Sequence, residues 1–485
     1  MRLPYNSFYF VGIGGIGMSA IAKILLQKGY KVSGSDLKTS PIVEELKRLG
    51  ADIVQGHTGE NIPGNDVVVV STAIPADNPE YTTALSLNIP ILRRAQMLAL
   101  LMKDYCKIAV TGTHGKTTST SMVTFILEKA GLSPTWVIGG ELNDFGSNGD
   151  LGSGRYFVAE ADESDASFLE LSPDIAVVTS MDVDVNLNVN IFGELNFDYE
   201  KISQKVRNMF LAFIDSVKND DGVILCSDNP NIRMVLSDLK KKYLTYGTNA
   251  SADLQARNVQ FSGVTSWCEV YYHGEFLGEL RLKVPGLHNI LNALGACAVG
   301  LRLGLKFNQM AEYLLDFHGV ARRFEILGEE REIMVVDDYA HNPAKIKAAV
   351  KAARGSGRKR VVAVFQPHRY SRTKLLFDQY KTIFSDNCDL LVVTRIYSAG
   401  EKPIEGVSGE ALAKEIKAVS LNTQVTYLPQ ENEVLEFLHR NVQAGDLVIM
   451  LGAGDITNTA HTFAQQLKRP QETLVAQKFT SAMLV

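Results

Sequence analysis

The chain has 485 residues, a formal net charge of −5, and a composition of 46% hydrophobic and 21% charged residues. This length suffices for about three domains of ordinary size, each with its own core. The negative charge disfavours a nucleic-acid partner bound by a broad basic surface. An uncharged run at residues 3–22 is glycine-rich and strand-turn-helix in character, which disfavours a signal peptide. No other apolar run approaches the ~20 residues of a membrane span.

The five cysteines are scattered and show no C-x-x-C spacing. An odd count at wide separation favours reduced thiols over a disulfide framework. We therefore expect a cytoplasmic protein.

The first part of the chain alternates short apolar runs with helical patterns. Helices are predicted at 18–28 and 42–49, and strands at "FYFVGIG", "KVSGSD", "DVVVVSTAI" and "PILRR". Such alternation predicts a parallel sheet covered by helices. The sequence therefore indicates an α/β domain over residues 1–105.

Two further α/β series follow. The second opens at "CKIAVTGTHGKTT", continues through "YFVAEAD" and "DIAVVTS", and ends in helices predicted over 289–303 and up to about 317. The third has predicted strands at "IMVVDDY", "RVVAVFQ", "DLLVVTRIY" and "DLVIMLGAG". Polar residues follow these strands, so functional groups are expected at the carboxyl ends of a parallel sheet. The predicted domains are 106–318 and 319–485.

A glycine-rich loop follows the first predicted strand. "VGIGGIG" fits G-x-G-x-x-G through Gly12, Gly14 and Gly17, and Asp36 ends the next strand at about the spacing of a ribose-binding acid. Backbone N–H groups at a helix N-terminus suit any diphosphate. A dinucleotide such as NAD, a nucleotide-sugar and a purely structural turn all stay open at this point.

A second loop, "GTHGKTT", lies between a predicted strand and a predicted helix. Gly112 and Gly115 let backbone N–H groups turn toward phosphate oxygens, Lys116 can reach the β- and γ-phosphates, and Thr117 can offer its hydroxyl to Mg²⁺. Only two residues separate the glycines, whereas the common P-loop has four. The strand-loop-helix context predicts an ATP site.

An acidic segment, "VAEADESD", follows a predicted strand of the same domain. It carries Glu160, Asp162, Glu163 and Asp165, whose oxygens suit Mg²⁺. A solvated acidic face is the structural alternative. The position directly after an apolar strand favours a metal role.

The short-spaced "GTHGKTT" resembles the loop of the Mur ligases and of their relatives, the folylpolyglutamate synthases. Further motifs extend the resemblance from about residue 7 to about residue 465: "FVGIGGIGMSAIA", "AEADESDASFL", "GLHNILNALGA", "ARRFEILGE", "VVDDYAHNP", "VFQPHRYSRT" and "LGAGDI". The chain is most similar to the members that act on UDP-N-acetylmuramate. The resemblance implies a Rossmann-like UDP-binding domain, a central P-loop ATPase domain and a Rossmann-like C-terminal domain.

The resemblance also implies the reaction. ATP would phosphorylate the lactyl carboxylate of UDP-N-acetylmuramate, and the amine of L-alanine would attack the acyl phosphate and form an amide. Mg²⁺ is the implied metal, with Mn²⁺ as a substitute. One loop then binds UDP and the other ATP, which disfavours NAD. No nucleic acid or membrane partner is expected, and the protein is expected to be a monomer or a homodimer.

The site residues implied by the resemblance fall into four groups. The catalytic residues are Lys116, Glu160, His341, His368, Arg369 and Arg372. The ATP contacts are Gly112, Thr113, His114, Gly115, Lys116, Thr117, Thr118, Asn289, Asn292, Arg323 and Asp338. The substrate contacts are Gly14, Gly15, Ile16, Gly17, Asp36, His57, Ser71, Thr72, Tyr339, His341, Arg369 and Arg372. The metal ligands are Thr117, Glu160 and Asp184.

The chemistry of these residue types agrees with the implied roles. Phosphoryl transfer depends on positioning and charge neutralisation, and guanidinium groups bind carboxylates through paired hydrogen bonds. Structural alternatives are a surface ion pair for Arg322 or Arg323, helix caps for the two asparagines, and a core position for either histidine.

One motif departs from the family pattern. The family carries T-N-I-x-x-D-H-x-D after a central strand, whereas this chain has Ser180 in the asparagine position and Val185 in the position of a metal-binding histidine. Either an oxygen of Asp182, Asp184 or Asn186 replaces the histidine, since Mg²⁺ prefers oxygen, or the second metal is lost. Two alternatives stay open: a murein-peptide ligase that adds a peptide to UDP-N-acetylmuramate, and a catalytically impaired nucleotide-binding homologue.

Overall fold

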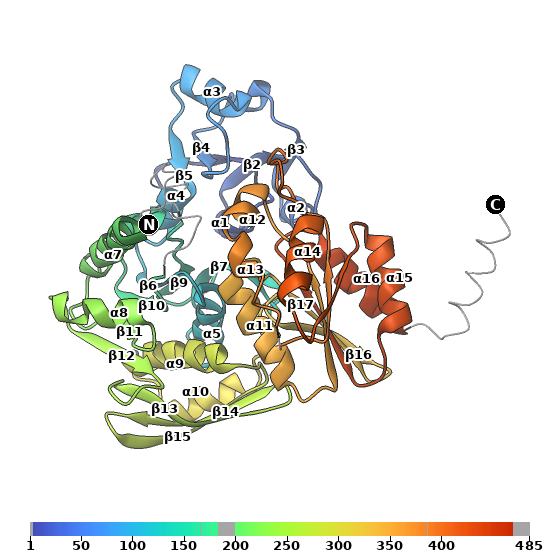
Figure 1. Ribbon diagram of the computed structural model, residues 1–485. Helices are drawn as coiled ribbons and strands as arrows, with labels where there is room; N and C mark the ends of the chain where they lie inside the picture. Colours follow the sequence, from blue (N-terminus) through green and yellow to red (C-terminus); the bar gives the residue numbers. More distant parts are fainter. Residues whose placement is uncertain (1–2, 165, 183–198, 386, 469–485) are drawn as a thin grey trace. The chain divides into compact units, whose positions relative to one another are not determined.

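The computed structural model describes residues 3–164, 166–182, 199–385 and 387–468 (Figure 1). Val185 and Asp184 lie outside the described residues. The chain divides into two compact units. The first comprises Met1–Val259, Trp267–Leu282 and His288–Val320, and the second comprises Gln260–Ser266, Lys283–Leu287 and Ala321–Val485.

The first unit begins with a five-stranded sheet in the order β3-β2-β1-β4-β5, drawn in blue in Figure 1. All its strand pairs are parallel. The strands are β1 Ser7–Val11, β2 Lys31–Asp36, β3 Asp52–Gln55, β4 Val67–Val70 and β5 Ile91–Arg93. The connecting helices are α1 Ile16–Gln27, α2 Pro41–Arg48, α3 Pro79–Ser86 and α4 Arg94–Leu101. The predicted α/β alternation is confirmed; β3 was not predicted, because its short sequence is largely exposed and lacks an apolar run.

A ten-stranded sheet follows in the same unit, in the order β15-β14-β13-β12-β11-β10-β6-β9-β7-β8. Its parallel part contains β6 Cys106–Thr111, β7 Thr135–Leu142, β9 Tyr156–Glu160, β10 Ile175–Val178, β11 Val223–Cys226, β12 Tyr243–Gly247 and β13 Leu254–Ser262. The other strands are β8 Ser147–Asp150, β14 Thr265–Tyr272 and β15 Glu275–Leu282. The helices include α5 Lys116–Lys129, α7 Tyr199–Asp215, α8 Pro230–Val235, α9 Leu287–Arg302 and α10 Phe307–Leu314.

The second unit contains a six-stranded sheet in the order β16-β17-β21-β18-β19-β20. Only β16 is antiparallel to its neighbour. The strands are β16 Glu325–Glu330, β17 Ile333–Asp338, β18 Arg360–Phe365, β19 Leu390–Val393, β20 Gln424–Tyr427 and β21 Asp446–Leu451. The helices are α11 Pro343–Gly355, α12 Tyr370–Leu375, α13 Phe377–Tyr380, α14 Gly409–Val419, α15 Glu431–Asn441 and α16 Ile456–Lys468.

Runs of buried apolar residues explain why these segments form strands within the sheets. Strands β4, β10, β19 and β21 are buried along their whole length, as expected for strands covered by helices on both faces. The three sheets confirm the predicted α/β class, while the exact domain boundaries stay a prediction. Across the part of the chain that the structure describes, no helix combines the length and the apolar character that crossing a membrane requires.

Candidate active site

The phosphate-type loop lies at the carboxyl edge of the central sheet. It follows β6, whose neighbours in the sheet are β9 and β10. Glu160 ends β9, and Thr179 and Ser180 directly follow β10. Because the three strands are parallel, their last residues meet at one edge.

Close packing requires glycine at two positions of the loop. Gly112 has φ +132°, and a Cβ there would lie 2.2 Å from the Thr179 Oγ1 atom. Gly115 has φ +80°, and a Cβ there would lie 2.5 Å from the Asn292 Oδ1 atom. A side chain at either position would be strained as well as crowded. The loop backbone is therefore packed directly against β10 and α9.

Ser180 binds the loop from the neighbouring strand. The His114 backbone N–H donates to its Oγ atom at 2.8 Å, and the Thr113 hydroxyl is 2.8 Å from the same atom. The Asp182 N–H donates in turn to Thr113 Oγ1. Ser180 is buried, so its hydroxyl supports the loop shape at the position where the family pattern has asparagine.

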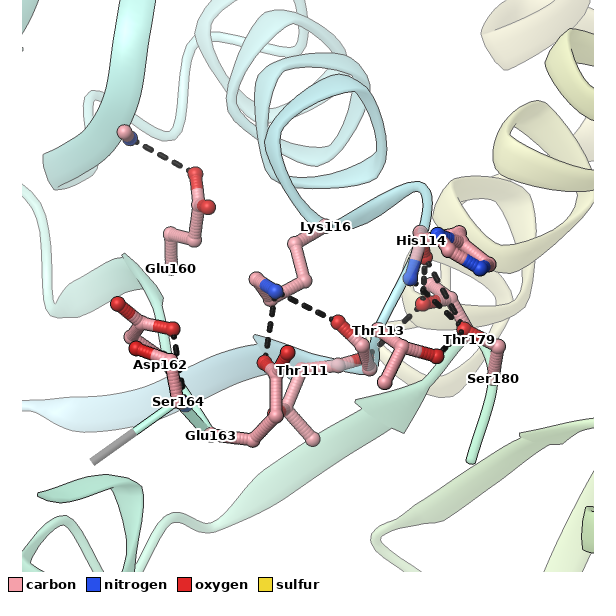
Figure 2. Close-up of polar contacts among 12 residues, drawn as sticks. Thr111, Thr113, His114, Lys116, Glu160, Asp162, Glu163, Ser164, Thr179 and Ser180 are labelled. Carbon is pink, nitrogen blue, oxygen red and sulfur yellow. Dashed lines mark hydrogen bonds and ion pairs between the residues drawn. The ribbon is translucent and has the colours of Figure 1, made fainter. Parts of the chain in front are cut away.

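Lys116, the first residue of α5, forms a buried ion pair. Its Nζ atom donates to Glu163 Oε2 at 2.6 Å and to the Gly112 carbonyl at 2.7 Å, as Figure 2 shows. Burial opposes the charged form of the lysine, but Glu163 and the nearby acids outweigh it and raise the pKa of Lys116 above its ordinary value. Glu163, one of the four acids considered for a metal role, thus binds the loop lysine, and that metal role stays a prediction.

Glu163→Gln is expected to strengthen ATP binding about tenfold, which corresponds to roughly 1.4 kcal/mol. Triphosphate must compete with the Glu163 carboxylate for Lys116, and the variant removes both that competition and the repulsion between like charges. Calorimetric titration with a non-hydrolysable ATP analogue measures the change. Glu170→Gln, at an exposed acid of the 3₁₀ helix Ser167–Glu170, is the control. Weaker binding in the Glu163→Gln protein would show that Glu163 helps to bind the nucleotide.

Two oxygen-bearing side chains adjoin the loop lysine. The Thr117 hydroxyl donates to Glu160 Oε1 at 3.1 Å, and the Gly139 N–H donates to Glu160 Oε2 at 2.7 Å. A hydroxyl and a carboxylate side by side suit a hard cation such as Mg²⁺. Within the described ranges no group of three or more His, Cys, Asp or Glu residues has the arrangement of a metal site. The third predicted ligand, Asp184, lies outside those ranges.

The two asparagines predicted to contact ATP lie inside α9 and are buried. The Asn292 Oδ1 atom accepts from the Ser119 hydroxyl of α5 at 3.1 Å, and its Nδ2 atom donates to Asn289 Oδ1. The alternative of a helix-capping role is therefore wrong for Asn292. Thr118, also predicted to contact ATP, lies in the first turn of α5.

The glycine-rich loop of the first sheet lies where the strand order reverses, between β1 and β4. Ligands bind in the crevice at such a reversal. Gly14 and Gly15 connect β1 to α1, Ile16 and Gly17 begin α1, and the Gly14 N–H donates to Asp36 Oδ2 at 2.9 Å. Ser71 and Thr72 directly follow β4. The structure thus brings the predicted UDP contacts to one sheet edge.

Arg94 was not among the predicted residues, although it lies beside this loop. Its side chain occupies the space next to Gly17, where an added Cβ would lie 3.1 Å from Arg94 Cδ. Its Nη2 atom is 3.9 Å from the Asp162 carboxylate. Arg94 thus connects the start of α1 with the acidic segment after β9. No motif spacing in the sequence relates Gly17, Arg94 and Asp162.

His57 belongs to a buried polar cluster around Glu80. The fully buried Glu80 carboxylate is contacted by the Tyr9 hydroxyl at 2.7 Å, the Ser35 hydroxyl at 2.6 Å, the His57 Nδ1 atom at 2.8 Å and the Asn61 amide at 3.1 Å. Burial and the Glu80 contact raise the pKa of Tyr9. Glu80 was not predicted from the sequence, and it determines where the His57 ring lies.

The second unit gathers the predicted C-terminal residues at the carboxyl ends of β17 and β18. Asp338 ends β17; it accepts from the Phe324 and Ala340 N–H groups, and burial raises its pKa to about 6. The Arg323 guanidinium lies 5.2 Å from the Tyr339 ring centroid. Arg322 donates to the Gly452 and Gly454 carbonyls, and its Nε atom lies 3.5 Å from the Asp337 carboxylate. The ion pair considered for Arg322 is therefore present, but its acidic partner is fully buried and not at the surface.

The histidines and arginines of this edge contact one another. The Arg372 Nη1 atom is 2.8 Å from His368 Nδ1, and the ring centroids of His341 and His368 are 5.9 Å apart. The more exposed Arg369 lies 3.7 Å from the Glu401 carboxylate. His341, His368 and Arg372, predicted from "DDYAHNP" and "QPHRYSRT", therefore form one cluster, and Arg369 directly follows His368 in the chain.

Arg369 has an unusual backbone conformation, φ +68° and ψ 138°. A side chain in this region of φ/ψ space costs about 1–3 kcal/mol. Arg369→Gly is therefore expected to raise the free energy of unfolding by about 1 kcal/mol while lowering ligase activity. Chemical denaturation and kinetics measure the two effects. Arg369→Ala keeps the backbone strain, so we expect it to lose the same activity without a higher free energy of unfolding. A higher free energy of unfolding in both variants would contradict the strain argument.

Comparison with known proteins places the three sheets in one family. The family descriptions "Mur ligase family, catalytic domain", "Mur ligase middle domain" and "Mur ligase, glutamate ligase domain" match residues 7–106, 110–300 and 322–454. The UDP-N-acetylmuramate–L-alanine ligase of Geotalea uraniireducens (strain Rf4) is 48% identical over 463 residues, which cover 96% of this chain and 98% of that protein.

Solved structures agree with this comparison. The crystal structure of UDP-N-acetylmuramate–alanine ligase from Thermotoga maritima has a TM-score of 0.78 and 28% identity, and covers 95% of this chain and 98% of its own. A murein peptide ligase from Psychrobacter arcticus 273-4 shares the fold, with a TM-score of 0.67 and 22% identity over 96% of this chain and 99% of its own.

Proposed function

The chain belongs to the Mur ligase family and is an ATP-dependent ligase, and we propose that it joins L-alanine to the lactyl carboxylate of UDP-N-acetylmuramate. The observation that carries the proposal is the 48% identity, across nearly the whole chain, to a ligase named for these two substrates. The paired phosphate-type loops at two sheet edges support it, since the reaction uses a nucleotide-sugar and ATP.

Phosphoryl transfer is assigned to the loop after β6. Its N–H groups and Lys116 would neutralise the charge on the phosphates, and transfer of the γ-phosphoryl group to the lactyl carboxylate gives an acyl phosphate and ADP. Mg²⁺ would be bound by Thr117 and Glu160, whose adjacent oxygens fit it. When bound, this ion supplies further neutralisation of phosphate charge.

Amide formation is assigned to residues of the second unit. The amine of L-alanine attacks the acyl carbon, and the intermediate collapses to the amide with loss of phosphate. Arg369 is a partly exposed guanidinium suited to the amino-acid carboxylate. Asp338 and Arg323 are proposed to contact ATP. The cytoplasmic location and a monomeric or dimeric state stay predictions.

Phosphate release from ATP tests the proposal. The assay combines the protein with UDP-N-acetylmuramate, with and without L-alanine, across titrations of Mg²⁺ and Mn²⁺. We expect release that requires both substrates and a metal, with UDP-N-acetylmuramoyl-L-alanine as product. Release that requires a peptide in place of L-alanine would establish a peptide ligase. Absence of release at every metal level would contradict the ligase assignment and point to loss of function through Val185.

A further inference from the structure

The contact between Arg372 and His368 determines which ring nitrogen of His368 carries the proton. A guanidinium group has five donors and no acceptor. Because Arg372 Nη1 lies 2.8 Å from His368 Nδ1, that nitrogen must accept. The proton of the neutral ring is therefore on Nε2. Arg372 is buried and lies in the first turn of α12, and His368 lies two residues before that helix, so the contact is local.

The opposite assignment follows for His341. Its Nδ1 atom lies 2.8 Å from the Tyr339 carbonyl oxygen, which can only accept. Nδ1 therefore carries the proton, and Nε2 of the neutral ring carries the lone pair. The Tyr380 hydroxyl donates to the His341 carbonyl at 2.8 Å, and Asn342 caps α11 directly afterwards. These bonds hold in place the backbone that carries the His341 ring.

The charges around both rings favour their neutral forms. Burial, followed by Arg372 and Arg369, lowers the pKa of His368 to about 4, with Arg322 acting in the same direction and Glu401 opposing. Burial, followed by Lys345 and Arg372, lowers the pKa of His341 well below its ordinary value. The ring of Tyr397 stacks on His368 with centroids 5.5 Å apart. Cations thus outnumber carboxylates on the elements that face the pair.

We propose that Arg372 and the Tyr339 carbonyl hold His368 and His341 as opposite neutral tautomers, so that one ring donates and the other accepts through Nε2. The pair would orient the amino-acid substrate: His341 Nε2 accepts from the α-amino group, and His368 Nε2–H donates to a carboxylate oxygen. This use of the pair rests on the proposed ligase function. Arg372 acts through His368 and is a positioning residue.

The first test is the tautomeric state of the intact protein. Long-range ¹H–¹⁵N spectra of protein labelled with ¹⁵N-histidine distinguish protonated from unprotonated ring nitrogens. The chain has nine histidines, and His341→Asn and His368→Asn assign the two signals. From about pH 5 to about pH 9, where an ordinary histidine titrates, we expect His368 to show only Nε2–H and His341 only Nδ1–H. Two protons on either ring near neutral pH, or the same tautomer in both, overturns the proposal.

The second test distinguishes the acceptor role of His368 Nδ1 from the donor role of its Nε2 atom. In His368→Asn the amide oxygen can still accept from Arg372, but the Nε2 donor is lost. His368→Gln places an amide N–H near the Nε2 position. We expect KM for L-alanine to rise about tenfold or more in the Asn variant, with partial recovery in the Gln variant and unchanged KM for ATP. His439→Asn, at an exposed histidine of α15, is the control. Equal effects on both KM values would contradict the assignment.

Arg372→Met tests the positioning role. Without the guanidinium donor, Nδ1 of His368 can take up a proton, so the pKa of His368 should rise toward its ordinary value and the acidic limb of kcat/KM for L-alanine should shift to higher pH. An unchanged pH profile in a folded variant contradicts the role of Arg372. If this variant does not fold, the spectra of the unmodified protein still decide the tautomers. If those spectra agree but L-alanine is not used, the proposed function fails and the tautomer assignment stands.

Discussion

Lys116→Met is expected to lower kcat for phosphate release about a thousandfold, because removing one preorganised charge from a transition state costs on the order of 10²–10³ or more. The lysine Nζ atom lies at the loop that is proposed to bind the phosphates, and it stays charged because Glu163 and two further acids surround it. Steady-state kinetics with saturating substrates measures the loss. Lys129→Ala, at the other end of α5, should leave kcat unchanged.

Lys116→Met leaves the buried Glu163 carboxylate without its cation. A loss of folding must therefore be separated from a loss of catalysis. The double variant Lys116→Met/Glu163→Gln removes both charges and should recover most of the lost free energy of unfolding. It should not recover kcat. Recovery of activity in the double variant would contradict a direct role of Lys116 in phosphoryl transfer.

Glu80→Gln is expected to lower the free energy of unfolding of the N-terminal sheet by about 3 kcal/mol. The carboxylate is fully buried and is contacted by four polar side chains, whereas an amide offers one oxygen acceptor and presents N–H donors to the others. Urea unfolding followed by near-UV signals of the tyrosines measures the change.

Two comparisons control the Glu80 experiment. Glu60→Gln, at an exposed acid of the neighbouring 3₁₀ helix, should change stability by no more than about 0.5 kcal/mol. KM for the nucleotide-sugar should rise in the Glu80→Gln protein because His57 loses its carboxylate partner and keeps only the Ser35 hydroxyl, while KM for ATP should not. If the Glu80→Gln protein is as stable as the parent, the cluster contributes no net free energy.

Local sequence patterns predicted the features that depend on neighbouring residues. Buried apolar runs such as that of β10 predicted the strands, and the spacing of Gly112, Gly115 and Lys116 predicted the strand-loop-helix at the ATP site. Such signals lie within one element, so backbone sterics and side-chain periodicity suffice to read them. The family resemblance supplied the remaining site residues, and those roles stay predictions.

The partners of these residues depended on contacts between distant segments. Glu163 binds Lys116 because the sheet order places β9 next to β6, although β7 comes first after β6 in the chain. Glu80 begins a helix, and nothing near it in the sequence shows that Tyr9, Ser35 and His57 surround its carboxylate. The tautomers of His341 and His368 depend on one carbonyl and one guanidinium a few ångströms away. Periodicity and motif spacing determine which segments form strands, loops and helices; strand order and side-chain packing determine which charges meet, because that choice minimises buried, unpaired polar groups across the whole fold.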